Sequence, residues 1–499
     1  MSLKKNVIAN YIGQAWTSLI SFIFVPVYIK YLGIESYGLI GFFTMLYAWL
    51  SLLDMGMTPT LSREMARYTA GVHDNQSILD LLRTIEYLYF SMSLLLGIAI
   101  WLSSDWLANY WLQTRELPVD TLITAISIMG MVISLRFIEG LYRGAIIGLQ
   151  QQVWLNIVNA TLATIRSVGA VFVLILIEPS IELFFLWQAI VSFISILIFI
   201  IVTYKYLPCS QKPAKFCINQ LKKIWQFSSN MMIITLLSLI LTQIDKIVLS
   251  RLLSLEMFGY YTLASIIANI LTQFVTPITQ AYYPHLVELV INNNNIELVE
   301  TYHQSSHLVS VIVIPATLIL FFCSANILLL WTHSSIVSIN VQPLLEVLAL
   351  GMMLNSFMHM PFLLTLAYGW TKFAICQDII AVVLLIPLII FASSQYGAIG
   401  AAFMWMLLNM CYVLISVHFL YRQLLSKEKW RWYICDIIFP MLASLLIGFF
   451  CQLVQPTIER ELVWLSWLLI TGALMVLGAW FSKYLSSLIM GEFVTIKIE

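Results

Sequence analysis

The strongest constraint on the fold of this chain is a series of fourteen apolar stretches, each long enough to cross a membrane as a helix. A membrane-spanning helix needs about 20 residues, because each residue rises ~1.5 Å and the hydrocarbon core is ~30 Å thick. Only 10% of the residues are charged, against about 25% in soluble domains. We therefore predict an all-α polytopic membrane protein. The predicted spans are 7–29, 37–57, 84–103, 118–138, 153–177, 181–203, 227–249, 257–280, 306–330, 343–366, 374–392, 399–420, 433–454 and 462–485.

The distribution of basic residues predicts how the chain is oriented in the membrane. The three longest polar connections, at 59–83, 204–226 and 281–305, fall on the same side. With the N-terminus inside, 18 of the 25 Lys and Arg residues lie on the inner side and only four on the outer side. Because basic loops resist translocation, we expect a multi-pass protein with both termini in the cytoplasm. The first apolar stretch lacks a cleavage site and is interpreted as a retained helix.

An internal repeat appears when the sequence is shifted by 221 residues. Glu35 then aligns with Glu256, Gly38 with Gly259, and Gly148 with Gly369. Each repeat has six spans, an even number, so the two copies share one orientation and are related by an axis along the membrane normal. This predicts two six-helix lobes around a central cavity. The predicted parts are an N-terminal lobe 1–203, a cytoplasmic linker 204–226, a C-terminal lobe 227–420 and an accessory helix pair with a cytoplasmic tail 421–499.

Charged residues inside apolar spans are the main candidates for a functional site, because a charge in hydrocarbon costs ~2.5 to 3.5 kcal/mol on insertion scales. Arg166 lies near the middle of its span, in NATLATIRSVGAVF. It could contact a phosphate, since a guanidinium group forms two-pronged bonds to phosphate oxygens. It could instead pair with a carboxylate on a neighbouring helix.

Asp245 and Lys246 lie near the outer end of the seventh span, in LTQIDKIVLSR. Adjacent helix residues do not share a face, so one of the two could face a cavity. Alternatively, Lys246 reaches the surface and Asp245 pairs with a neighbour. Both interpretations remain open.

A second group of charges is Arg136, Glu139 and Arg143, in SLRFIEGLYRG at the inner end of the fourth span. Their spacing aligns them on one helix face, where Glu139 could bridge both arginines. The alternative is a basic inner mouth that attracts a diphosphate.

Three acids near the inner ends of spans, Asp54, Glu86 and Asp378, are candidates for coupling to protons or cations, although such end positions are often simply hydrated. His303 and His307, in HQSSH, lack the nearby carboxylate of a zinc hydrolase. We interpret them as part of a junction between a loop and a helix.

Several function classes are disfavoured by what the sequence lacks. The 25 basic and 25 acidic residues leave no net charge to attract nucleic acid, and the seven cysteines show no metal-ligand spacing. We found no glycine-rich phosphate loop and no catalytic motif. We expect no cofactor and no metal, and movement driven by an ion gradient, the membrane potential or the substrate's own gradient.

The chain resembles the polysaccharide exporters and O-antigen flippases of the multidrug/oligosaccharidyl-lipid/polysaccharide superfamily. The resemblance rests on KKNVIANYIGQAWTSLISFIFVPVYIKYLGIESYGLIGFF, LLDMGMTPTLSREMAR, EGLYRGAIIGLQQQ and QIDKIVLSRLLSLEMFGYYTLA. It implies transport of an undecaprenyl-diphosphate-linked oligosaccharide from the inner to the outer leaflet of a bacterial inner membrane by alternating access. It also implies membrane lipids as surroundings, and a glycan polymerase and a chain-length regulator as partners. Arg166, Asp245 and Lys246 match the cavity charges of that family by position and type.

Two other functions compete with the flippase. An ion-coupled multidrug exporter of the same superfamily would share the fold. A membrane glycan polymerase or ligase would use the same lipid donor, but such an enzyme normally needs a large outer loop. The outer loops predicted here have at most about 14 residues.

Overall fold

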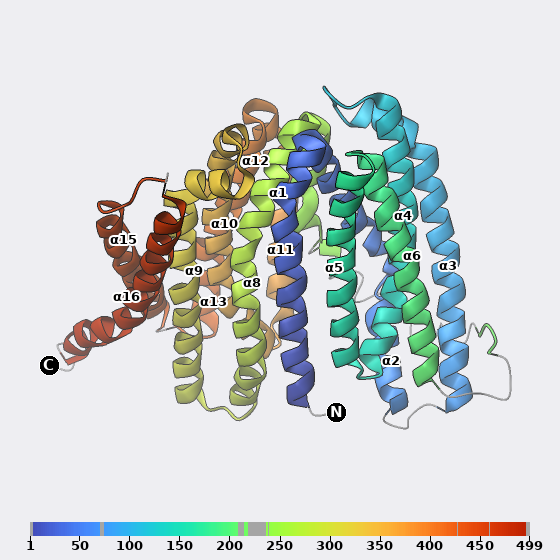
Figure 1. The fold of residues 1–499 in the computed structure, drawn as a ribbon. Coiled ribbons are helices and arrows are strands. Elements are labelled where there is room, and N and C mark those ends of the chain that lie inside the picture. The colour runs from blue at the N-terminus through green and yellow to red at the C-terminus, as the bar shows by residue number, and fades with distance from the viewer. Residues whose placement is uncertain are drawn as a thin grey trace. The chain divides into compact units, whose positions relative to one another are not determined.

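The computed structural model consists of long helices, as the apolar stretches predict (Figure 1). It describes the backbone of residues 3–69, 74–207, 214–217, 236–237, 239–426, 428–458 and 460–495. Within this part of the chain, twelve helices are long and apolar enough to cross a membrane. The first of them contains the first two predicted spans, and much of the predicted span 227–249 falls outside the described residues. The all-α fold class is therefore confirmed.

The chain divides into two compact units, residues 1–259 and 260–499. In the first unit, α1 packs against α5, and α4 packs against α2, α3 and α6. Residues 239–252 are also helical. The named elements that begin in this unit are α1 (Leu3–Leu50), η1 (Ser51–Asp54), α2 (Met57–Thr69), α3 (Asn75–Trp106), η2 (Leu107–Trp111), α4 (Val119–Gly148), α5 (Gln152–Leu176), α6 (Ile181–Tyr206) and α8 (Leu255–Ile291).

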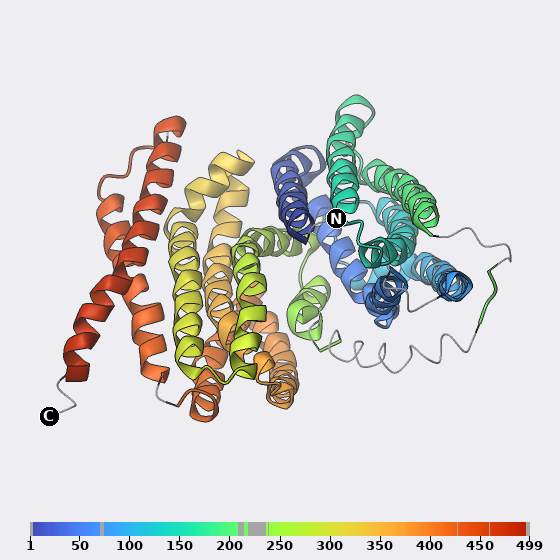
Figure 2. The same ribbon diagram turned by 90° about the horizontal axis from the view of Figure 1, so that it is seen from below.

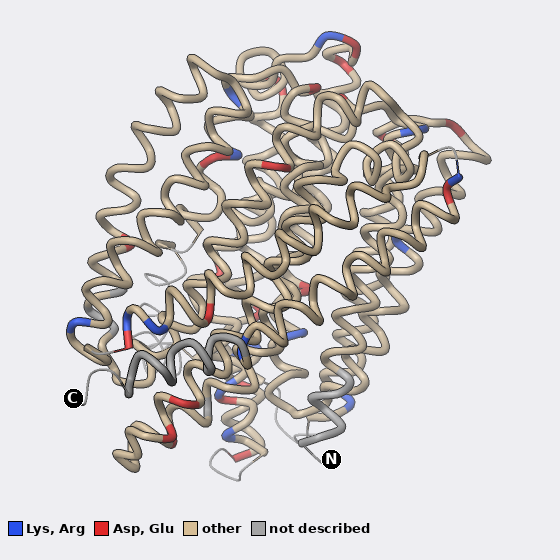
Figure 3. Tube along the Cα trace, turned by 90° about the vertical axis from the view of Figure 1, so that its left-hand side faces the viewer, with Lys and Arg blue, Asp and Glu red and all other residues tan. Residues whose placement is uncertain are grey.

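In the second unit, α10 packs against α9 and α12, and the last two long helices, α15 and α16, pack against each other and against α9 (Figures 1 and 2). Long stretches of these helices carry no charged residue (Figure 3). The elements are α9 (Asn295–Thr332), α10 (Ser335–Ala367), α11 (Thr371–Tyr396), α12 (Ala398–Cys411), η3 (Tyr412–Ser416), α13 (Val417–Gln423), α14 (Lys429–Arg431), η4 (Trp432–Ile438), α15 (Phe439–Gln452) and α16 (Glu461–Thr495).

The first two predicted spans are two helices within α1, separated at Gly33, whose non-helical φ of 82° suits a residue without a side chain. One boundary differs from the sequence prediction. The segment 281–305 is not a long loop, because α8 continues to Ile291 and α9 begins at Asn295. His303 and His307 therefore lie inside α9 rather than at a junction. The polar residues mark where α8 and α9 leave the membrane, but both helices continue beyond that point.

Two of the residues that the repeat aligns, Gly38 and Gly259, touch each other. An added Cβ on Gly38 would collide with the backbone oxygen of Leu255 and lie 3.2 Å from the Gly259 nitrogen. One on Gly259 would lie 2.6 Å from the Ile34 oxygen. Small residues allow such close backbone approach between membrane helices, so the glycines at these positions have a packing reason.

The connection before α4 is held by a buried carboxylate. Glu35, only 3% exposed, accepts hydrogen bonds from the backbone N–H groups of Arg115 at 2.6 Å and Glu116 at 2.7 Å. The same connection pairs with the start of α8, since the N–H of Leu255 donates to the Gln113 oxygen at 2.7 Å. These bonds satisfy backbone groups that an irregular segment in this setting would otherwise leave without partners.

Candidate functional site

Four charged residues from two helices form a cluster inside the first unit. Arg166 of α5 donates through Nη2 to Oε2 of Glu139 on α4, at 2.9 Å. Arg143, one turn further along α4, lies with Nη1 at 3.5 Å from Oε1 of the same carboxylate. Glu139 is 3% exposed, and the Arg166 side chain is 19% exposed. We call Arg136, Glu139, Arg143 and Arg166 the arginine cluster.

Arg136 has different neighbours from those the sequence predicted. Its Nη2 donates to Oε1 of Gln188 on α6 at 3.0 Å, and its guanidinium carbon lies 5.2 Å from the centre of the Phe43 ring. The prediction that Glu139 pairs with Arg143 is confirmed by the structure. The second arginine at Glu139 is Arg166, because the packing of α4 on α5 brings these helices together.

The arginine cluster has an excess of positive charge and open hydrogen-bond donors. Three guanidinium groups and one carboxylate leave two positive charges in excess, in a site where Arg166 is largely buried and Arg143 is partly hydrated. The Nε atoms of Arg136 and Arg166 are buried and make no hydrogen bond within the described part of the chain. Buried donors of this kind normally have a partner. A bound anion with several oxygen atoms would supply both the charge and the acceptors.

Asp54 and Glu86 are both engaged in hydrogen-bond networks of the first unit. Asp54 accepts from the backbone N–H of Thr58 at 3.1 Å and from its hydroxyl at 2.5 Å, as a helix cap would, and also from the Tyr89 hydroxyl. Such bonds satisfy the free N–H groups at the start of α2. The proposed coupling role of Asp54 stays a prediction.

Glu86 of α3 links three helices. It pairs with Arg83 at 2.9 Å and accepts from the hydroxyls of Tyr142 on α4 and Tyr204 on α6, both at 2.8 Å. The carboxylate is buried, with the residue 2% exposed. This arrangement satisfies the buried charge, and the coupling role of Glu86 also stays a prediction.

The remaining candidate residues are Asp245, Lys246 and Asp378. Asp245 and Lys246 are half-buried in the helical segment 239–252, and Lys246 donates to Oε1 of Gln243 at 3.1 Å. Asp378 is half-buried on α11 in the second unit. The structure does not decide between the alternative roles of these residues.

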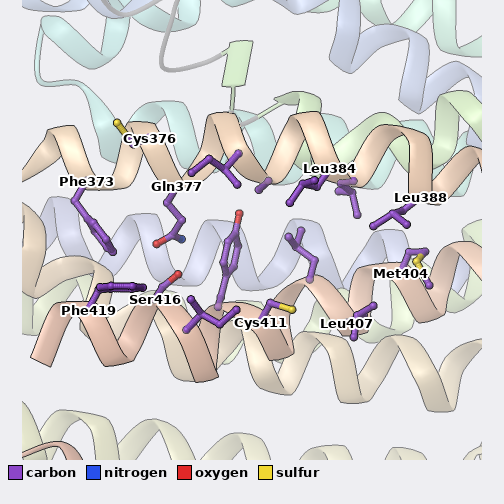
Figure 4. Close-up of a pocket in the computed structure, with 16 residues that line it drawn as sticks. Phe373, Cys376, Gln377, Leu384, Leu388, Met404, Leu407, Cys411, Ser416 and Phe419 are labelled. Atoms are coloured by element: carbon purple, nitrogen blue, oxygen red, sulfur yellow. The ribbon is translucent and has the colours of Figure 1, made fainter. Parts of the chain in front are cut away.

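The second unit contains an apolar slot between α11 and α12 (Figure 4). Its volume is about 360 Å³. Phe373, Leu384 and Leu388 of α11 face Leu407 of α12 and Phe419 of α13 across it (Figure 4). None of the residues that line the slot is charged. Such a lining suits hydrocarbon and does not suit a diphosphate.

The fold of this chain is similar to that of solved transporter structures. A structure described as "Lipid II flippase MurJ, inward closed conformation" aligns with a TM-score of 0.66 at 16% identity, covering 98% of this chain and 99% of that one. An inward-facing multidrug resistance MATE family transporter of the MOP superfamily aligns with a TM-score of 0.65 at 13% identity, covering 83% and 96%. The fold is therefore that of the multidrug/oligosaccharidyl-lipid/polysaccharide superfamily.

Within this class, the family is shown by a match at the sequence level. The model of the family described as polysaccharide biosynthesis protein matches residues 3–290, and the chain belongs to this family. A Shigella flexneri protein named "Putative O-antigen transporter" is 23% identical over 81% of this chain and 94% of its own. A Salmonella typhi protein of the same name is 25% identical over 52% and 59%. The family resemblance seen in the sequence is confirmed, and these proteins are named as transporters or flippases, not enzymes.

Sequence reasoning missed two contacts of the arginine cluster, that of Arg136 with Gln188 and that of Arg166 with Glu139. Gln188 lies in an apolar stretch, LFFLWQAIVSF, where a single polar residue is a signal. Glu139 was assigned to its own helix only, because spacing along one helix says nothing about which neighbouring helix lies opposite. A polar residue in an apolar span normally has a partner, and a search for such pairs across helices could have linked Glu139 with Arg166.

Proposed function

We propose that this chain is a flippase that moves an undecaprenyl-diphosphate-linked oligosaccharide from the inner to the outer leaflet of the bacterial inner membrane by alternating access. The observation that carries the proposal is the arginine cluster with its two uncompensated positive charges. The names of the relatives from Shigella flexneri and Salmonella typhi support the same substrate class.

The diphosphate is the part of this substrate that the arginine cluster can recognise. Its oxygens would accept from the open Nε donors of Arg136 and Arg166, and its negative charge would balance the two excess positive charges. Glu139 has a second role in this scheme. It holds Arg166 in place before the substrate binds, and it competes with the diphosphate for the same guanidinium, so that the anion is not held too tightly to leave.

The test is glycan export in a bacterium whose own flippase has been replaced by this protein. Arg166→Lys keeps a positive charge but loses the planar two-pronged contact, so export should be partial. Arg166→Ala should abolish export while the protein remains in the membrane. Lys205→Gln, which removes an exposed lysine at the end of α6, is the control and should export normally. An Arg166→Ala variant with full export would refute the role of the cluster.

A multidrug exporter of the same superfamily is the alternative function, and the fold alone does not distinguish the two. The charge of the arginine cluster favours the flippase, because a cationic drug would be repelled there. Drug susceptibility in a strain without its own efflux pumps separates the two functions. Resistance conferred by this protein, without glycan export, would support the exporter.

Asp245, Lys246, Asp54, Glu86 and Asp378 remain candidates for contact with the substrate or with a coupling ion. If Asp245 and Lys246 have this role, neutralising either should reduce export at unchanged protein abundance. Normal export by both variants would assign the pair a structural role.

The orientation and partners belong to the same proposal. The twelve candidate spans and the bacterial transporter relatives support a multi-pass bacterial membrane protein. We place both termini in the cytoplasm, so a reporter fused after residue 215 should be inside and one fused near residue 110 should be outside. The reverse result at both sites would refute this orientation. A glycan polymerase and a chain-length regulator are the proposed protein partners, testable by crosslinking in membranes.

A further inference from the structure

A second cavity in the second unit is lined in part by polar side chains. Its volume is about 380 Å³, and it opens where α16 packs beside α9. Its lining includes Tyr282 of α8, Gln304 and His307 of α9, and Trp480 and Lys483 of α16. The cavity thus joins the last long helix to the two helices that precede α10.

The groups that line this cavity suit an anion. Lys483 supplies a positive charge and Gln304 an amide, and none of the lining residues is Asp or Glu. His307 is 4% exposed, and its ring lies within hydrogen-bonding reach of the backbone of Cys435 and Trp480. Its Nε2 nevertheless makes no hydrogen bond of ordinary geometry within the described residues. A buried ring nitrogen of this kind normally has a partner, and an anion oxygen in the cavity would provide one.

Carboxylates around these helices have partners of their own, and Glu300 accepts from Nε2 of the lining residue Gln304 at 3.1 Å. Asp436 of η4 lies with Oδ2 at 2.5 Å from Nδ1 of His303, and it also attracts Lys483. Glu428 lies 3.1 Å from Nε2 of the same histidine and 3.3 Å from Arg431. These pairs engage Asp436 and Glu428 with residues outside the cavity lining, so the two acids do not make the cavity a site for cations.

The cavity lies where the helices change from apolar to polar, as expected at the edge of the hydrocarbon. The sequence of α9 is polar through NIELVETYHQSSH and becomes apolar in LVSVIVIPATLIL. That of α16 is apolar through LMVLGAWF before Lys483. Tyr and Trp, here Tyr282 and Trp480, are typical of this boundary. Leu477 and Phe481, next to the cavity on α16, are 52% and 61% exposed, so that hydrocarbon chains can lie against them.

We propose that this cavity binds the phosphate of an anionic phospholipid, and that the bound lipid stabilises the contact of α16 with α9. Basic pockets between membrane helices are known to bind anionic head groups. The phosphate would lie between Lys483 and His307, and the acyl chains would run along α16. In the proposed orientation, the lipid belongs to the cytoplasmic leaflet. The inference does not depend on which substrate is transported.

The test uses the purified full-length protein in detergent. Native mass spectrometry should show bound phosphatidylglycerol, and this lipid should raise the melting temperature, whereas phosphatidylcholine with the same acyl chains should do neither. Removal of one lysine charge corresponds to about a fivefold weaker affinity, which we expect for Lys483→Gln. Lys483→Arg should bind like the wild type. The matched control, Lys205→Gln, removes an exposed lysine far along the chain and should also bind normally.

His307→Gln is the second variant, because it replaces a buried ring without removing a formal charge, and it should weaken phosphatidylglycerol binding as well. Equal effects of the two lipids would refute the proposal, as would wild-type affinity in both Lys483→Gln and His307→Gln. A titration with inorganic phosphate distinguishes a lipid head group from a free phosphate ion as the bound anion. If phosphate alone stabilises the protein as much as phosphatidylglycerol, the cavity is a site for a free anion and the lipid proposal is wrong.

Discussion

The arginine cluster allows structural and functional roles to be separated by one double-mutant experiment. Glu139→Gln removes the only carboxylate of the cluster, and Arg166→Gln removes its closest partner, 2.9 Å away. Loss of one member of a buried ion pair leaves the other charge without compensation. Removing both should therefore cost less stability than the sum of the two single changes.

The structure sets the expected size of these effects. Loss of one partner of a buried pair costs ~3 to 5 kcal/mol of unfolding free energy. We expect about 3 kcal/mol for Glu139→Gln, because Arg166 is only 19% exposed and Arg143, at 42%, remains hydrated. Arg166→Gln should cost less, about 2 kcal/mol, since Glu139 keeps Arg143. The double variant should cost about 3 kcal/mol instead of the ~5 kcal/mol of simple addition.

The assay measures unfolding in detergent and glycan export for the same four proteins. Under the proposed function, Arg166→Gln and the double variant both fail to export, although the double variant is about as stable as Glu139→Gln alone. Glu64→Gln, which removes a buried carboxylate of α2, is the control and should lower stability without blocking export. Additive losses of stability would refute the coupling of Glu139 with Arg166. Export by the double variant would show that Arg166 only balances the charge of Glu139 and does not bind the substrate.

Three further predictions concern stability and are measured by melting temperature and unfolding in detergent. Gly38→Val should lower the free energy of unfolding by about 1 to 3 kcal/mol, because the added side chain overpacks the contact with Leu255. Gly140→Ala should not destabilise the protein, because an added Cβ there would have no atom within 4 Å. Equal stability of the two variants would contradict the close contact at Gly38. Glu35→Gln should cost about 1 to 3 kcal/mol, because an amide cannot accept all of its backbone bonds; an unchanged melting temperature would argue against this anchor. His303→Ala should lower the free energy of unfolding by about 3 kcal/mol, because it leaves the buried carboxylate of Asp436 without its partner. Asp436→Asn should cost less. A larger loss for Asp436→Asn than for His303→Ala would refute this prediction.

Much of the candidate site could be recognised from the sequence because a charge in hydrocarbon is rare at any position. Arg166 stands out for this reason alone, and the pairing of Glu139 with Arg143 follows from their spacing on one helix. The bond from Arg136 to Gln188 could not be predicted, because the two residues are 52 positions apart and come from different helices.

Helix ends were the weaker part of the prediction. The polar segment 281–305 was assigned to a connection between spans because it is polar, yet most of it is helical. Hydropathy reports where a helix leaves the hydrocarbon, and the backbone bonds of a helix can continue beyond that point into water. At Gly33 the prediction of two separate spans agrees with the structure, since this single residue with positive φ separates the two helices of α1.

The sequence by itself determined the membrane class, the approximate positions of the spans and the family, because the thickness of the hydrocarbon core and the cost of burying polar groups act on every stretch of chain separately. Only the tertiary structure decided which residues meet. The two glycines, Gly38 and Gly259, and the pair of Arg166 with Glu139 are brought together by the rotation and crossing of packed helices. That geometry depends on how side chains from several helices fit at once, and no single stretch of sequence contains it.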